Sequence, residues 1–165
     1  MSRELIEKIV VTLVLVAWYF LMPQKGYTAD TEDPAHITYI LCHANIWHLA
    51  GNVFVLWMMK GRLHIASSFI IAFLCSYIPV IGTIWDSFVF DGETMGFSGV
   101  IFAIAGIQWG WYIFDSYGEK RKKAEKTFLT KVLPFAFVGI LIPHINWCIH
   151  LYCMMAGFIY GRCRR

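Results

Sequence analysis

The sequence predicts an all-α membrane protein, a single domain of residues 1–165 that forms a bundle of six transmembrane helices. Of the 165 residues, 58% are hydrophobic and only 15% are charged, whereas soluble globular proteins contain about 25% charged residues. Apolar runs alternate with short charged segments, and no linker rich in Pro, Gly or Ser divides the chain. The chain therefore has too few charged residues to cover a soluble surface.

Each expected membrane helix is an apolar run bounded by charged or turn-forming residues, because about 20 helical residues cross the hydrocarbon of a bilayer. The six runs are Leu5–Met22, Ile37–Met59, His64–Gly82, Gly96–Phe114, Phe128–Ile142 and Ile145–Gly161. The first run ends without a small-residue cleavage site, so we expect it to be retained. The last two runs are short for two crossings, and a re-entrant hairpin is an alternative there.

The distribution of charge predicts the orientation of these helices, because Lys and Arg in short loops stay on the cytoplasmic side. All of the 14 Lys and Arg residues except Lys25 fall on one side of the six runs. Both termini of this multi-pass protein are therefore expected in the cytoplasm, and a bacterial inner membrane is the expected location. The net charge of only +3, without a basic face, argues against nucleic-acid binding.

Four polar side chains are expected inside the apolar helices, where a polar group is costly. They are His48, Asn52, Ser98 and His150. Both histidines precede a cytoplasmic basic residue by about 12 positions, which places them about 18 Å above that boundary. Ser98 starts its helix in the same non-cytoplasmic half. Each side chain alone fits a structural role, as a helix cap or a hydrogen bond between helices, but together they form one layer.

This layer contains the groups that acyl transfer requires. A serine hydroxyl becomes nucleophilic when an imidazole within hydrogen-bond reach accepts its proton, which predicts a catalytic pair of Ser98 and His150. The tetrahedral intermediate needs donors around its oxyanion. The Ser98 amide, the Asn52 side chain and the His48 ring are the candidates. Phe102, one turn after Ser98, is expected to stack on His150.

Glycines predict close contact between the fourth and the sixth helix. Gly96 and Gly99 flank the candidate nucleophile, and Gly157 and Gly161 form a Gly-x-x-x-Gly face after the candidate base. Small residues of this kind let membrane helices approach closely. We expect this packing to hold the serine against the histidine.

With these motifs, the sequence resembles the rhomboid intramembrane serine proteases over residues 43–161. The motifs are His43-Ala-Asn-Ile-Trp-His48-Leu-Ala-Gly-Asn52, Gly96-Phe-Ser98-Gly99, and His150 followed by Ala156-Gly157 and Gly161. Two features depart from the family pattern: the loop of residues 23–35 is short and lacks a Trp-Arg pair, and Cys153 stands where a glycine is common.

The resemblance implies a specific activity and site. Ser98 would be the nucleophile, His150 the general base, and His48 and Asn52 with the Ser98 amide the oxyanion hole. The implied substrates are single-span transmembrane proteins, cut in or near the lipid bilayer from the non-cytoplasmic side. No metal and no cofactor are implied.

Two other functions fit parts of the sequence. A catalytically inactive rhomboid-like protein would bind membrane proteins or assist their quality control, but such relatives typically lack the serine or the histidine. The six histidines suggest a metal transporter. However, His43 and His48 do not share a helical face, and no intramembrane carboxylate completes a metal site.

Overall fold

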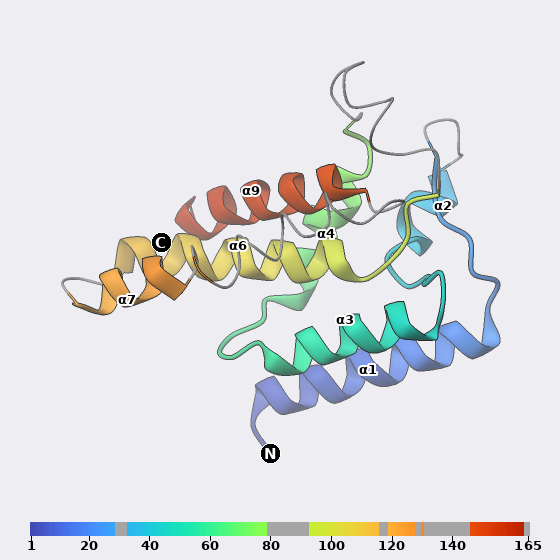
Figure 1. The fold of residues 1–165 in the computed structure, drawn as a ribbon, viewed down its shortest axis with the longest axis horizontal. Helices are drawn as coiled ribbons and strands as arrows, with labels where there is room; N and C mark the ends of the chain where they lie inside the picture. Colours follow the sequence, from blue (N-terminus) through green and yellow to red (C-terminus); the bar gives the residue numbers. More distant parts are fainter. Residues whose placement is uncertain (29–32, 79–92, 116–118, 128–129, 131–145, 164–165) are drawn as a thin grey trace.

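The computed structural model describes residues 1–28, 33–78, 93–115, 119–127, 130 and 146–163, which are mainly helical (Figure 1). The helices are α1 (Arg3–Leu21), α2 (Asp33–Thr38), α3 (Ile46–Met58), α4 (Ile65–Cys75), α6 (Ser98–Asp115), α7 (Glu119–Thr127) and α9 (Trp147–Cys163). The prediction of a helical fold is confirmed for this part of the chain. None of the helices described combines the length and the apolar character of a membrane crossing. The six crossings and the position of the termini stay predictions.

One predicted membrane helix, Ile37–Met59, is wrong as a continuous element. It is interrupted because α2 ends at Thr38 and α3 starts only at Ile46. The side-chain oxygen of Asn45 accepts the backbone N–H of His48 at 2.9 Å and caps α3. A search for apolar runs does not detect such a break, since the residues on both sides are apolar.

The other predicted runs agree with the structure to different extents. Helices α1, α6 and α9 begin and end within about two residues of their predicted runs, which is the usual uncertainty of helix ends. Helix α4 ends at Cys75, before the predicted Gly82, and residues 79–82 lie outside the described part. The run Phe128–Ile142 also lies outside it, apart from Thr130. Helix α7 is not among the predicted apolar runs, because it consists mostly of charged residues.

Helices α6 and α9 lie side by side and run in the same direction (Figure 1). Their backbones touch at glycines. A Cβ atom added at Gly106 would lie 2.1 Å from the carbonyl oxygen of Met154, and one added at Gly157 would lie 2.4 Å from that of Ala103. The two helices therefore pack at a distance that only glycine permits.

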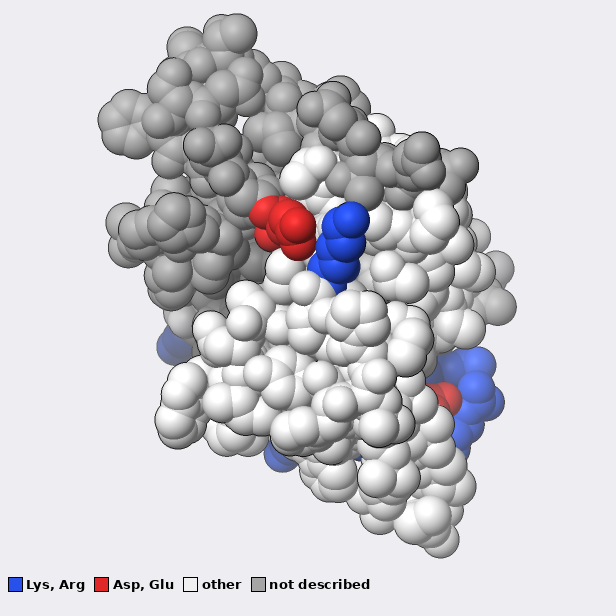
Figure 2. Space-filling model, turned by 90° about the vertical axis from the view of Figure 1, so that its right-hand side faces the viewer, with Lys and Arg blue, Asp and Glu red and all other residues white. Residues whose placement is uncertain are grey.

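Helices α3, α6 and α9 all begin at the same end of the molecule (Figure 1). The described surface of this end is mostly uncharged (Figure 2). A helix N-terminus carries a partial positive charge from its aligned peptide dipoles. Three such N-termini at one end favour negative charge there.

Tyr39 joins the segment before α3 to two other helices. Its buried hydroxyl donates a hydrogen bond to the carbonyl oxygen of Ala72 in α4 at 2.8 Å. Its own carbonyl oxygen accepts the N–H of Gly96, just before α6, at 2.9 Å. Tyr39 thus fixes the start of α6 relative to α4.

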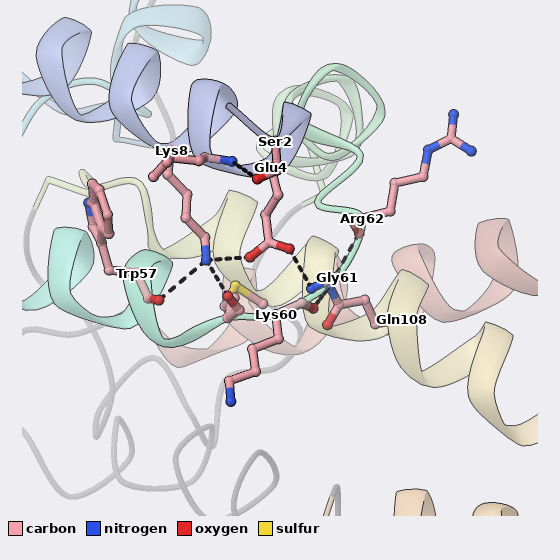
Figure 3. Close-up of polar contacts among 10 residues, drawn as sticks. Ser2, Glu4, Lys8, Trp57, Lys60, Gly61, Arg62 and Gln108 are labelled. Carbon is pink, nitrogen blue, oxygen red and sulfur yellow. Dashed lines mark hydrogen bonds and ion pairs between the residues drawn. The ribbon is translucent and has the colours of Figure 1, made fainter.

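Helix α1 is attached to the end of α3 by a buried lysine (Figure 3). The Lys8 ammonium donates to Glu4 Oε1 at 2.8 Å and to the carbonyl oxygens of Trp57 and Met59. These carbonyls belong to the C-terminal turn of α3 and its cap, where a cation is favourable. Lys8 therefore satisfies groups that the helix itself leaves without partners.

The loop between α3 and α4 receives further hydrogen bonds from both neighbouring helices (Figure 3). Glu4 Oε2 of α1 accepts the N–H of Gly61 at 3.0 Å. The Gln108 amide of α6 donates to the carbonyl oxygens of Lys60 and Arg62 at 2.9 and 3.2 Å. Helices α1, α3 and α6 are thereby connected at the C-terminal end of α3.

Replacing Gly157 with alanine is expected to destabilise the contact between α6 and α9. The added methyl group would meet backbone atoms of Ala103, which cannot move aside as a flexible side chain would. We expect a loss of about 1–3 kcal/mol, measured by thermal unfolding in detergent. Gly51→Ala is the matched control, because nothing lies within 4 Å of its Cβ position, and it should be neutral or stabilising by up to about 1 kcal/mol. Equal losses in both variants would contradict the packing.

Replacing Lys8 with alanine should lower stability by about 1–3 kcal/mol, because it leaves partly buried acceptors without their charged donor. The control is Arg3→Ala, whose side chain is 78% exposed and pairs with Glu7 at 2.8 Å. An exposed pair of this kind contributes about 0–1 kcal/mol. Melting temperatures of the two variants should differ clearly, and equal values would refute the role of Lys8.

The same interaction has a defined pH dependence. The hydrogen bond from Lys8 lowers the pKa of the Glu4 carboxyl from its ordinary value of 4.5. Because the pKa is lower in the folded state, the stabilisation is complete above about pH 4.5 and is lost as the pH falls through the lowered pKa. The difference between the wild type and Lys8→Ala should therefore shrink in acid.

Candidate active site

Ser98 is the first residue of α6, and the glycine before it makes the turn into the helix possible. Gly96 has a φ of +126°, which residues with a side chain rarely adopt. A Cβ atom at this position would also lie 2.8 Å from the His48 ring. The chain can therefore pass beneath that ring and present the serine only with glycine at this position.

Ser98 and His150 meet across the contact between α6 and α9. Ser98 Oγ lies 2.8 Å from His150 Nε2, which is a hydrogen-bond distance. The buried His150 ring stacks on Phe102, with ring centroids 4.5 Å apart and planes inclined by 26°. This arrangement orients the imidazole so that it can accept the serine proton.

Asn52 and His48 place hydrogen-bonding groups next to Gly96, in the turn that leads to Ser98. They are four residues apart on α3 and so share a face. Asn52 Nδ2 lies 3.5 Å from the Cβ position of Gly96. Among the described residues, this buried nitrogen has no hydrogen-bond partner. A buried donor without an acceptor costs about 1–3 kcal/mol, and a negatively charged oxygen bound near Ser98 would satisfy it.

His43 supports the His48 ring from the segment before α3. Its ring is fully buried, and its Nδ1 donates to the carbonyl oxygen of Leu41 at 3.1 Å. The two histidine rings meet edge to face, with centroids 5.2 Å apart. This contact limits the positions that His48 can adopt.

The structure brings the side chains of Ser98, His150 and Phe102 into contact, and it places those of His48 and Asn52 next to Gly96. The remaining predicted glycines lie in helix contacts. Gly99 faces the Sγ of Cys153, which is 3.4 Å from its Cβ position, and the backbone of Ile107 meets Gly161. Gly157 meets Ala103, as described above. Within the described ranges, no three His, Cys, Asp or Glu side chains lie close enough to hold a metal ion.

The sequence patterns do not indicate three residues that form hydrogen bonds next to the site. Tyr39 binds the chain before α6, while Thr94 and Asn146 bind each other at 2.8 Å. The only signal in the sequence is spacing, since Thr94 and Asn146 each stand four residues before a member of the predicted catalytic pair.

Comparison with known proteins identifies the family. Residues 34–165 match the family model of the Rhomboid domain, so the chain belongs to the rhomboid family, as its motifs predict. The chain is also similar to a putative rhomboid protein of Acanthamoeba polyphaga mimivirus. The two are 26% identical over 157 residues, which cover 92% of this chain and 86% of the viral protein. No solved structure matches the chain with statistical significance.

Family membership supports an association with membranes. The expected bacterial location receives no support, because the similar protein is viral. The catalytic roles of the site residues also stay predictions at this point.

Proposed function

We propose that this rhomboid protein is an intramembrane serine protease that cleaves single-span membrane proteins in or near the bilayer. The observation that carries the proposal is the 2.8 Å contact between Ser98 Oγ and His150 Nε2. It pairs a nucleophile with a base at the start of a helix, beside a buried amide donor that has no acceptor among the described residues. A protein that only binds membrane proteins would not need this combination.

The reaction follows from the positions of these groups. His150 Nε2 accepts the hydroxyl proton as Ser98 Oγ attacks the peptide carbonyl carbon. The carbonyl oxygen becomes negative, and the Ser98 N–H, the Asn52 amide and the His48 ring are its donors. His150 then gives its proton to the departing amine, which leaves an acyl-enzyme. A water molecule attacks this ester with His150 again as base, which frees the carboxyl product and restores the serine.

The outer surface of the helices supports a place in the lipid bilayer. Large apolar side chains point outward from several helices in the described part of the chain. Those more than half exposed include Leu13 and Phe20 of α1, Phe54 and Met58 of α3, Ile70 and Leu74 of α4, and Ile159 of α9. Lipid would cover these side chains, since large exposed apolar patches are rare on soluble monomers.

A transmembrane substrate must lose helical structure where it is cut. A helix hides its carbonyl groups in internal hydrogen bonds, and the reacting carbonyl must approach Ser98 Oγ to about 3–3.5 Å. The proposed substrates are therefore spans whose outer end unwinds easily, for example at Gly or Pro.

A serine-reactive fluorophosphonate probe tests the proposed nucleophile. The wild-type protein in detergent should be labelled at Ser98 and should cleave a reconstituted single-span substrate, whereas Ser98→Ala and His150→Ala should do neither. Ser68→Ala is the control, because this buried serine has no hydrogen-bond partner in the part of the chain described and should leave labelling unchanged. Labelling that persists in Ser98→Ala, or a wild type that neither reacts nor cleaves, would refute the proposal.

Replacing Asn52 with alanine tests the oxyanion donor. The donor meets the negative charge only in the transition state, so kcat should fall while KM stays nearly constant. Loss of one such donor costs about 100- to 1,000-fold in other serine proteases. We expect about 100-fold or less here, because two donors remain. Turnover per titrated active site, together with the melting temperature, provides the measurement.

A destabilised Asn52→Ala protein with normal turnover would show that the asparagine only connects helices. The same measurement on His48→Ala should give a similar loss of kcat. The double variant should lose more than the product of the single losses if each donor partly replaces the other when one is removed.

A further inference from the structure

We propose that Thr94 and Asn146 form a positioning pair that fixes Ser98 and His150 relative to each other, a role that rests on the proteolytic function proposed above. The Asn146 amide nitrogen donates to Thr94 Oγ1 at 2.8 Å. Both side chains are buried, with 6% and 7% exposure. The pair lies outside the site and touches neither reacting atom.

The position of the pair in the sequence matches that of the predicted catalytic residues. Thr94 stands four residues before Ser98, and Asn146 stands four residues before His150. Both hydrogen bonds therefore join residues that are 52 positions apart. Any movement of α9 relative to the chain that enters α6 would change both bonds together.

Each partner of the pair is held in place by a second interaction. Asn146 Oδ1 accepts the N–H of Ile149 at 3.4 Å, in the first turn of α9. Because the amide is planar, this bond also sets the direction of its NH₂ group. On the other side, the backbone of Thr94 exchanges two hydrogen bonds with Tyr27, at 2.8 and 3.0 Å. The pair thus connects the first turn of α9 to the backbone at Thr94, which is bonded to Tyr27.

The backbone contacts between α6 and α9 do not by themselves fix the N-terminal ends of the two helices. The backbone contacts at Gly106 and Gly157 lie at least one turn further along α6 and α9 than the site. At the level of Gly99, the thiol of Cys153 fills the space between the helices, 3.4 Å from the Cβ position. A side chain packs less rigidly than backbone, so polar bonds determine the spacing of the helices here.

The reaction itself removes one of these polar bonds. Once Ser98 Oγ is acylated it has no proton to donate to His150, yet the histidine must stay in place to activate water. The bond between Thr94 and Asn146 is not consumed at any step. It can therefore hold the base in position throughout the catalytic cycle.

The test compares isosteric and conservative variants of the full-length protein in detergent. Thr94→Val removes the hydroxyl without changing the shape, and Thr94→Ser keeps the hydroxyl. Asn146→Ser keeps a good helix cap but is too short to reach Thr94. The measurements are the rate of fluorophosphonate labelling at Ser98, kcat and KM for a single-span substrate, and the melting temperature.

Thr94→Val and Asn146→Ser should each lower the labelling rate and kcat about five- to tenfold with KM unchanged. Thr94→Ser should be close to wild type. The double variant should be no slower than the slower single variant, because both changes remove the same bond. If Thr94→Val does not fold, Asn146→Ser gives the same test from α9.

Three results would overturn the proposal, and they show which part of it fails. If the probe labels the wild type and Thr94→Val is labelled equally fast, the positioning role alone is refuted. The same holds if Thr94→Ser is labelled as slowly as Thr94→Val. A wild type that the probe does not label would refute the proteolytic function and the positioning role with it.

Discussion

Backbone contact between α6 and α9 is the constraint on which the rest of the site depends. At Gly106 and Gly157, carbonyl oxygens of the opposite helix occupy the space that a side chain would need, 2.1 and 2.4 Å from the Cβ positions. Helices that are packed so closely cannot slide past each other without losing many contacts. Ser98 and His150 lie beyond this contact, on the same two helices, and the contact brings the helices close enough for their 2.8 Å hydrogen bond.

The direction of the helices determines the electrostatics of the site. Because α6 and α9 run in the same direction, both begin at the same end of the molecule, and α3 begins at that end too (Figure 1). Their N-termini therefore carry positive dipole ends at this end of the molecule. Asn52 adds a buried amide donor from the next turn of α3. Negative charge can thus be stabilised at the site without a lysine or an arginine.

The sequence predicts much of the helical framework and the set of candidate site residues, because both depend on local patterns. Apolar runs locate α1, α6 and α9, and motif spacing together with membrane depth selects Ser98 and His150. The interruption of Ile37–Met59 is not predictable from hydropathy, since it depends on the cap at Asn45.

Local sequence patterns do not predict contacts between segments that are far apart in the chain. Tyr39 reaches α4 and the start of α6, and Thr94 meets Asn146, but neither contact has a local signature. The catalytic roles are inferred from the chemistry of the side chains and from the rhomboid resemblance.

A structure of the protein after reaction with a fluorophosphonate would test the proposed active site most directly. We expect a phosphorus atom bonded to Ser98 Oγ, with the phosphonyl oxygen within hydrogen-bond distance of Asn52 Nδ2 and of the Ser98 N–H. An adduct on another side chain, or a phosphonyl oxygen directed away from α3, would contradict it.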